Sequence, residues 1–342
     1  MVGTDTPKRP ILIAGLGSIG RRHLRNLVAL GGPPPLLYRT GKGQAGDLNH
    51  DVPTVHDLGD ALAQRPQAVV VSNPTALHVE TALAAAKAGC HLLLEKPISH
   101  TRDGLDALRR AVEVRWLTVL VGFQFRFHPT LAQVQTWLHD GAIGRLVSAQ
   151  VHWGEYLPGW HPAEDHRLGY SARADLGGGV IHTLSHPLDY LRMLLGDIDG
   201  GGEVIRVSAM TTQQGGLGIE VEDVACLTLG LANGALVQVY LDYVQRPPSH
   251  TLRIVGSAGR VDWDNATATA RLYRATTGTW TEALPPDGFE RNDLFREEMR
   301  HFLACLDGSE SPRCTLEDGV RALDIALAAY ESAAAGRMVT LA

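Results

Sequence analysis

ILIAGLGSIG, residues 11 to 20, decides the fold of this chain. Four apolar residues predict a buried strand, and Gly15, Gly17 and Gly20 follow in G-x-G-x-x-G spacing at the start of a helical pattern. In that context the first glycine allows a tight turn, the second lets a pyrophosphate approach the backbone, and the third lets helix and strand pack closely. The turn, with Ser18 and Ile19, therefore predicts a dinucleotide site at a helix N-terminus. A glycine-rich turn in another kind of α/β protein is the alternative.

Short apolar runs alternate with helical patterns up to about residue 122. Strand-like runs such as AVVVSNP and HLLLEKP are separated there by helix-like runs such as HVETALAAAKAG. Repeated β-α units of this kind predict a doubly wound parallel sheet, because each crossover helix packs back on the sheet. Residues 1–122 are therefore predicted to form an NAD(P)-binding Rossmann domain in an α/β protein.

Longer alternating runs, such as LVSAQVHW and ALVQVYLDY, dominate the rest of the chain. Asn233-Gly234, between two such runs, predicts a tight hairpin. Residues 123–342 are therefore expected to form an α+β domain with an open, mostly antiparallel sheet. Its last helices are expected at about 293–307 and 316–335.

Composition excludes several classes of function. The net charge of −6 lacks the basic footprint that nucleic-acid binding requires. No apolar run approaches the length of about 20 residues that a membrane span needs, and the first ten residues lack an apolar secretion signal, so a cytoplasmic protein is expected. The four cysteines have no CxxC spacing, so neither a disulfide framework nor a zinc knuckle is predicted.

The residues after the second apolar run bear on the choice of cofactor. A dinucleotide site usually has an acidic residue there to hold the ribose, whereas this chain has Arg39 and Thr40. A cation can hold a 2′-phosphate, so NADP is favoured over NAD; stacking of Arg39 on adenine would leave NAD as the alternative. Asn73 and Pro74, which end the run AVVVSNP, are expected to lie against the cofactor, with His78 nearby.

A further apolar run, LLLEKPIS at residues 92–99, ends on two opposite charges held by a proline. In a doubly wound sheet, ligands bind beyond the carboxyl ends of the strands, so Glu95 and Lys96 are predicted to reach the cofactor. The Lys96 ammonium can donate to the oxygen of a reacting alcohol or carbonyl, and Glu95 can orient it or neutralise its charge. An exposed Glu-Lys pair at a strand end is the alternative.

Together with these motifs, GFQFRFHP (122–129) and DLGGGVIHTLSHPLDYLRMLLG (175–196) resemble the glucose-fructose oxidoreductase/inositol dehydrogenase/rhizopine-catabolism (Gfo/Idh/MocA) family of NAD(P)-dependent oxidoreductases. The resemblance implies a Rossmann domain, a second domain whose open sheet mediates homodimers or homotetramers, and sugars, polyols or their relatives as substrates. The lysine of the family's E-K-P motif is catalytic, so the resemblance implies that role for Lys96, and also a cis Lys96-Pro97 bond.

The family also has an aspartate after the glycines and a histidine four residues later. This chain has His182 and His186 there, so the histidine is kept and the aspartate is replaced. On one continuous helix, His182, His186 and Asp189 would share a face. An imidazole suits removal of an alcohol proton at neutral pH, which favours His186 as the base. His182 then either binds a substrate hydroxyl or is inert, and Pro187 is expected to bend the helix.

Residues 152–179 are rich in Trp, His, Tyr and Arg and have no regular periodicity, which predicts a long ordered loop that carries binding groups. Trp153 is expected to stack on a sugar ring, while the arginines hold hydroxyls or an anion. A contact between subunits is the alternative for each residue. The predicted substrate-binding residues are Arg126, Trp153, Arg167, Tyr170, Arg173, His182 and Asp189.

The sequence thus predicts hydride transfer between a nicotinamide and a secondary alcohol or ketone of a sugar, cyclitol or nucleotide-sugar-like substrate. Lys96 polarises the oxygen and His186 exchanges the proton in this hypothesis. One alternative is a non-catalytic dinucleotide-binding regulator, although a regulator needs neither Lys96 nor His186. The other is a metal-dependent enzyme that uses the i, i+4 pair His182 and His186, but Thr183 stands where a zincin has its glutamate, so no metal is predicted.

Overall fold

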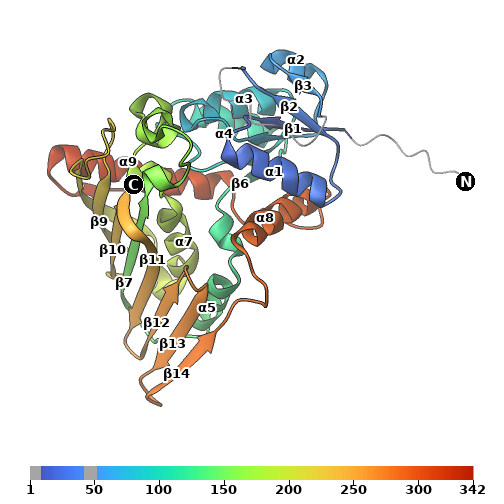
Figure 1. Ribbon diagram of the computed structural model, residues 1–342. Helices are drawn as coiled ribbons and strands as arrows, with labels where there is room; N and C mark the ends of the chain where they lie inside the picture. Colours follow the sequence, from blue (N-terminus) through green and yellow to red (C-terminus); the bar gives the residue numbers. More distant parts are fainter. Residues whose placement is uncertain (1–8, 42–51, 342) are drawn as a thin grey trace, which may run out of the picture. The chain divides into compact units, whose positions relative to one another are not determined.

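The computed structural model describes residues 9–41 and 52–341 (Figure 1). They form two compact units, one of residues 9–41, 52–124 and 290–317, the other of residues 125–289 and 318–341. The second domain was expected to be continuous from residue 123. The structure differs because the chain returns to the first unit at residue 290.

The described part of the first unit is built on a parallel sheet in the order β3-β2-β1-β4-β5-β6. Its central side chains are fully buried on both faces, which is why these strands appear in the sequence as continuous apolar runs. The predicted doubly wound parallel sheet is therefore confirmed. The strands are β1 (Ile11–Ala14), β2 (Pro35–Tyr38), β3 (Thr54–Val55), β4 (Ala68–Val71), β5 (His91–Leu94) and β6 (Val119–Val121).

Helices cover both faces of this sheet. The chain moves one way along the sheet from β1 to β2 and the other way from β4 to β5, so right-handed crossovers place their helices on opposite faces. One face carries α1 (Ser18–Ala29) and α8 (Arg291–Leu306), and the other carries α2 (Leu58–Ala63), α3 (His78–Lys87) and α4 (Leu105–Val114) (Figure 1). Helix α8 is attached to α1 by Asn292 Nδ2, which donates to Asn26 Oδ1 at 3.1 Å.

The second unit contains a mixed sheet in the order β14-β13-β12-β11-β7-β10-β9-β8-β15. Among the described strands of this sheet only β7 and β10 pair in parallel, so the predicted open, mostly antiparallel sheet is confirmed. The predicted hairpin at Asn233-Gly234 joins β9 to β10, with Gly234 at φ +87°. The strands are β7 (Leu146–Tyr156), β8 (Val204–Thr212), β9 (Val224–Leu231), β10 (Leu236–Asp242), β11 (Val244–Gly256), β12 (Gly259–Asp264), β13 (Thr269–Arg274), β14 (Thr279–Ala283) and β15 (Val339–Thr340).

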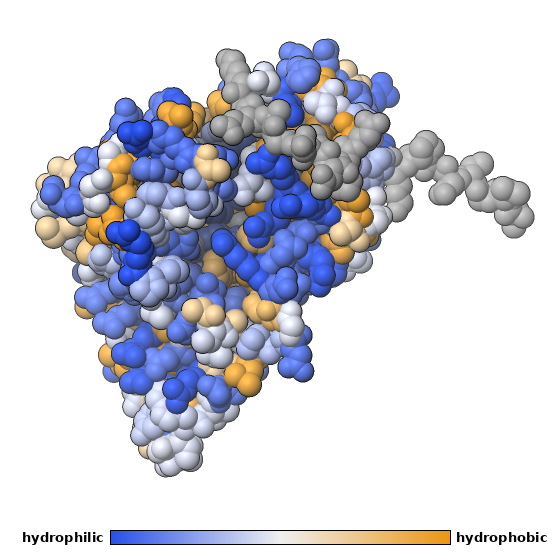
Figure 2. Space-filling model, in the orientation of Figure 1, coloured by the Kyte–Doolittle hydropathy of each residue, from blue (hydrophilic) through white to orange (hydrophobic). Residues whose placement is uncertain are grey.

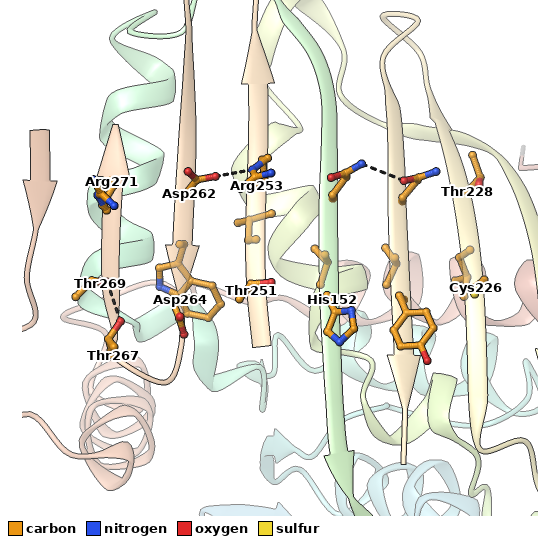
Figure 3. Close-up of a pocket in the computed structure, with 18 of the residues that line it drawn as sticks. His152, Cys226, Thr228, Thr251, Arg253, Asp262, Asp264, Thr267, Thr269 and Arg271 are labelled. Atoms are coloured by element: carbon orange, nitrogen blue, oxygen red, sulfur yellow. Dashed lines mark hydrogen bonds and ion pairs between the residues drawn. The ribbon is translucent and has the colours of Figure 1, made fainter. Parts of the chain in front are cut away.

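Helices contact one face of this sheet, where α5 packs on β12 and β13, and α6 packs on β9 and β10. The opposite face is open, and Figure 3 shows its side chains in rows that cross the strands. A hollow of about 810 Å³ on this open face is lined mainly by polar residues, including Gln150, Arg253 and Asp262. The helices are α5 (Pro129–His139), α6 (Val180–Thr183), α7 (His186–Leu195) and α9 (Leu316–Ala335).

The surface seen in Figure 2 is mostly hydrophilic, and its hydrophobic residues form small separate groups. Among the described residues, no helix combines the length and the apolar character that crossing a bilayer requires.

Candidate active site

The turn between β1 and α1 shows why each glycine is needed. Gly15 has φ +99°, and a Cβ there would lie 2.6 Å from Asn73 N. A Cβ on Gly20 would lie 2.0 Å from the Gly15 carbonyl oxygen, which Ser72 Oγ also approaches as a donor at 2.9 Å. By contrast, nothing lies within 4 Å of a Cβ built on Gly17. Packing of the protein therefore explains two of the glycines, whereas at Gly17 the described structure leaves space that a ligand can approach.

The N-terminus of α1 is suited to that ligand. Gly17 is the N-cap and supplies no side-chain acceptor, and the first backbone bond of the helix runs from Arg21 N–H to Gly17 O at 3.0 Å. The preceding N–H groups, including those of Ser18 and Ile19, therefore have no acceptor within the helix. Asn73 Oδ1, buried in the loop after β4, has no hydrogen-bond partner in the described structure. An anionic dinucleotide fits these donors and this acceptor.

The loop that follows β4 is fixed by His78, the first residue of α3. Its ring is 2% exposed, and its two nitrogens lie 2.8 Å from the carbonyl oxygens of Asn73 and Pro97. Burial lowers the pKa of His78, and the two carbonyl oxygens oppose that shift. His78 was predicted to contact the cofactor. Its ring nitrogens instead join the loop after β4, which continues with Pro74, to the loop after β5.

Glu95, at the end of β5, turns into the unit. It is 6% exposed, its Oε1 lies 2.7 Å from His23 Nε2 on α1, and its Oε2 accepts the Lys96 N–H at 3.1 Å. Burial raises the pKa of Glu95, but the hydrogen bond from His23, together with Lys96, brings it below its ordinary value. The strand therefore ends on two charges because the acid anchors the main chain that presents the lysine. This anchoring differs from the predicted contact of Glu95 with the cofactor.

Lys96 itself is partly buried, and the Lys96-Pro97 bond is cis. The loops after β1, β4 and β5 leave the same edge of the sheet, because these strands are parallel neighbours. The edge also includes the end of β2, where Arg39 N–H donates to Val55 O at 3.1 Å and Thr40 is exposed. The predicted lysine and the glycine turn thus belong to one edge of the first unit.

Residues 177–179 of the second unit are three consecutive glycines, and the last of them makes room for the side chain of Glu222. A Cβ on Gly179, which has φ +107°, would lie 2.6 Å from both Glu222 Oε1 and the Tyr330 hydroxyl oxygen. Glu222 Oε1 accepts hydrogen bonds from that hydroxyl at 2.7 Å and from Ile181 N–H at 3.1 Å. Burial raises the pKa of Glu222. The His182 ring lies against the same tyrosine, with centroids 4.8 Å apart.

The two predicted site histidines lie on different helices. His182 is in α6 and His186 begins α7, with Leu184 at φ −94° and ψ +35° between them. The expectation that one helical face presents both histidines together with Asp189 is therefore wrong for His182. Pro187 lies in the first turn of α7, where the missing N–H removes no helical hydrogen bond, so it starts the helix and does not bend it.

His186 packs among aromatic rings. It is 3% exposed, and its ring lies 5.0 Å from that of Phe125 and 5.6 Å from that of Trp153. Trp153 is 5% exposed and stacks on His250 at 4.2 Å, with the planes 1° apart. Trp153 was predicted to stack on a sugar ring. It stacks on an imidazole of the chain itself and supports His186.

Arg126 and Asp189, both predicted to bind substrate, bind each other. Arg126 Nη2 lies 2.7 Å from Asp189 Oδ1, and its Nε donates to Oδ2 at 2.9 Å. The two side chains are 8% and 1% exposed, and Asp318 also lies 3.2 Å from the guanidinium. A buried bidentate pair of this kind fixes α7, which carries His186, to the segment around Arg126.

The remaining predicted substrate residues lie in the segment 157–179, which forms four short 3₁₀ helices. Arg167 pairs with Asp165 at 2.7 Å, and Arg173 pairs with Asp175 at 2.5 Å. Tyr170 is 37% exposed. Both arginines are thus paired with acids two residues away.

One group of described residues has the geometry of a metal site, and it does not include His182 or His186. The ligand atoms of His23, Glu95 and Glu298 all lie within 4.8 Å of one another. Glu95 was singled out from the sequence, but its grouping with His23 and Glu298 was not predicted, because the three residues come from segments far apart in the chain. One hint was available in the sequence, the position of His23 on the apolar face of α1. There was none for Glu222.

Two family models match the chain. Residues 9–123 match an oxidoreductase family with an NAD-binding Rossmann fold, and residues 131–262 match the GFO/IDH/MocA C-terminal domain. The chain is 28% identical to D-xylose 1-dehydrogenase (NADP(+)) 2 of Haloferax volcanii, with 85% of this chain and 86% of the relative covered. It is 27% identical to 1,5-anhydro-D-fructose reductase of Ensifer adhaerens, with 98% and 96% covered. The structure of levoglucosan dehydrogenase with NADH and levoglucosan has the same fold, with a TM-score of 0.85, 20% identity, and 97% and 99% covered.

Proposed function

Because this chain belongs to the GFO/IDH/MocA family of NAD(P)-dependent oxidoreductases, we propose that it acts on a secondary alcohol or ketone of a sugar-like or cyclitol-like substrate. The observation that carries the proposal is the open space beside Gly17, at the sheet edge that also presents Lys96. The names of the two relatives, a sugar dehydrogenase and a sugar-derivative reductase, support the substrate class.

The roles of the residues follow from their chemistry. Bound nicotinamide accepts or supplies the hydride. The Lys96 ammonium donates to the reacting oxygen and stabilises its developing negative charge. His186 accepts the proton of the alcohol, or returns it in the reverse direction, and Phe125 and Trp153 hold its ring in place. His182 is proposed to bind a neighbouring hydroxyl of the substrate.

The test is a panel of sugars, cyclitols and nucleotide sugars, with reduced nicotinamide followed by absorbance for both cofactors in both directions. Lys96→Ala is expected to lower kcat by about 10²-fold or more. Cofactor affinity is expected to be nearly unchanged, because the glycine turn is intact. Lys87→Ala, at an exposed lysine in α3, is the matched control and should behave as wild type. Full turnover by Lys96→Ala would refute the proposal. So would wild-type protein that binds the cofactor but turns over no substrate of the panel, because it would then be a regulator.

We further propose that NADP is the preferred cofactor. Arg39 follows β2 directly, and residues 39–41 contain no carboxylate to hold a ribose hydroxyl. The NADP-dependent xylose dehydrogenase among the relatives supports this preference. Calorimetric titration should give tighter binding of NADP, and Arg39→Ala should weaken NADP binding while NAD binding changes little. Tighter binding of NAD by the wild type would overturn the preference.

The open sheet face is proposed to join copies of this chain into a homodimer or homotetramer. Strand register places Met210, Cys226, Tyr240 and His152 in one row across β8, β9, β10 and β7, and Figure 3 shows the part of this row around His152 and Cys226. Met210 is 78% exposed, which leaves an apolar side chain for a partner to cover. Light scattering after size-exclusion chromatography should show an oligomer for wild type and a smaller species for Tyr240→Arg. A monomeric wild type would contradict this proposal.

A further inference from the structure

Three buried ionisable side chains meet beside the loop of the first unit that carries Lys96. They come from α1, the end of β5 and α8, and His23, Glu95 and Glu298 are 0%, 6% and 0% exposed. Their ligand atoms all lie within 4.8 Å of one another. Gly122 closes one side of the group, since a Cβ there would lie 3.2 Å from the Glu95 carboxylate. The three side chains are therefore shielded from bulk solvent.

The hydrogen bonds of His23 define where its proton lies. Nε2 lies 2.7 Å from Glu95 Oε1, whereas Nδ1 is buried and has no partner in the described structure. A proton on Nδ1 would be an unsatisfied buried donor, which is costly, so the neutral tautomer with its proton on Nε2 fits best. His23 therefore donates to Glu95 and contributes no positive charge to the group.

Glu298 is the member that these bonds leave unexplained. Both of its oxygens are buried, and neither has a hydrogen-bond partner in the part of the chain that the structure describes. As an anion it would stand beside the Glu95 carboxylate with no donor of its own, and like charges this close repel strongly in a medium of low dielectric. As a neutral acid it has one hydroxyl donor, and the nearest acceptor that the group offers is the Glu95 carboxylate, one oxygen of which lies within 4.8 Å of a Glu298 oxygen. Burial and the charge of Glu95 both raise the pKa of Glu298.

We propose that Glu298 is a positioning residue for Lys96: it keeps a proton as a neutral acid and donates it to the Glu95 carboxylate. Glu95 receives two hydrogen bonds in the structure, from His23 and from the Lys96 main-chain N–H, and the proposed proton on Glu298 would add a third. The arrangement ties the lysine to α1, the helix that begins at the glycine turn, and to α8. The inference rests on the proposed function of Lys96.

A bound cation is the alternative occupant of the same three side chains. It would have to replace the bond between His23 and Glu95, because both groups would turn their lone pairs to the metal. The existing 2.7 Å bond and the missing partner of Nδ1 fit a proton better. Elemental analysis of the purified full-length protein separates the two, since stoichiometric metal would overturn the proton assignment.

The kinetic test compares Glu298→Leu with Glu298→Gln. Leucine removes the donor, so kcat is expected to fall by about 10-fold to 10²-fold through misplacement of the lysine, with KM little changed. Glutamine keeps a neutral side chain with an N–H donor and should restore kcat to within about threefold of wild type, as the amide reproduces the donor. Equal loss in both variants would mean that the acid must ionise, and would overturn the proposal.

A spectroscopic test does not depend on turnover or on the folding of the leucine variant. Infrared spectra of wild type labelled with ¹³C-glutamate should show the carbonyl stretch of a neutral carboxylic acid at pH 8, and this band should be absent from Glu298→Gln. Absence of the band from wild type would overturn the proton assignment even if the enzyme turns over. Presence of the band in a protein that turns over no substrate would refute only the proposed function.

Discussion

Each unit of the protein has a glycine-rich turn that leads into a helix, and the two turns are built for different purposes. At Gly179 of the second unit, the space that a side chain would need holds the Glu222 carboxylate and the Tyr330 hydroxyl. At Gly17 of the first unit, the corresponding space holds no atom of the described structure. A glycine whose Cβ would meet the chain itself serves folding. Gly17 has φ −65°, so neither packing nor backbone strain demands a glycine there, and the open space is available to a ligand.

The comparison also shows how the helix N-termini are satisfied. Glu222 Oε1 accepts the Ile181 N–H at the start of α6, so that end is already occupied by an anion. The start of α1 has no side-chain cap, and its first N–H groups remain donors for a ligand. The four substitutions below test this difference, in order of their expected effect on the free energy of unfolding.

Gly20→Ala is expected to have the largest effect. Its Cβ would lie 2.0 Å from the Gly15 carbonyl oxygen, and backbone cannot move aside as a side chain can. We expect a loss of about 3 kcal/mol or more in the free energy of unfolding. Urea denaturation without cofactor measures it, and a loss below about 1 kcal/mol would mean that helix and strand are not as closely packed as described.

Gly179→Ala is expected to cost about 2–3 kcal/mol, because only glycine readily adopts its φ of +107° and ψ of +150° and because the Glu222 carboxylate must move. The matched control is Gly216→Ala, since Gly216 has φ +69° but nothing within 4 Å of the Cβ position. The difference between the two losses in urea denaturation measures the combined effect of Glu222 and of the more restricted backbone conformation at Gly179. Equal losses would show that neither the carboxylate nor the backbone conformation makes Gly179 special.

Glu222→Gln should change how stability depends on pH. Burial raises the pKa of Glu222 above its ordinary 4.5, so the folded protein binds this proton more tightly than the unfolded chain does. The contribution of Glu222 to the stability of wild type therefore falls as pH rises from 4.5 through the raised pKa, and glutamine removes that contribution. Relative to wild type, the variant should gain stability between pH 4.5 and pH 8 in urea denaturation. A parallel pair of pH profiles would indicate that the carboxyl has its ordinary pKa.

Gly17→Ala is expected to have the smallest effect on stability, within about 0.5 kcal/mol of wild type. Its effect should instead fall on cofactor affinity, which is expected to weaken about tenfold or more because the methyl group occupies the space beside the helix N-terminus. Calorimetric titration of NADP and NAD measures the affinity, and denaturation without cofactor is the control. A variant as unstable as Gly20→Ala with unchanged affinity would remove the distinction between the two turns.

The elements of the first unit followed from local patterns in the sequence. Runs such as ILIA at residues 11–14 are buried on both faces and therefore appear as continuous apolar segments. The short strands β12 and β14 were not predicted, since brief alternating segments beside turns give little periodicity. The return of residues 290–317 to the first unit was also missed, because a helix pattern shows an apolar face and not its partner.

Among the candidate site residues, the glycines gave the firmest predictions, since each has a geometric reason that spacing alone expresses. Roles assigned from side-chain chemistry fared differently. Arg126 and Trp153 have the right groups for holding a sugar, but the chain itself provides Asp189 and His250 as their partners. A polar or aromatic side chain predicts that a partner exists, without telling whether the partner is a ligand or another residue.

The sequence by itself determined the doubly wound sheet, the cofactor turn and the position of Lys96 at the end of a strand. These features depend on backbone conformation and burial over a few consecutive residues. Only the tertiary structure decided that Glu95 faces His23, 72 positions away, and that Arg126 faces Asp189, 63 positions away. Buried polar groups must find hydrogen-bond partners, and which ones they find depends on how distant segments pack.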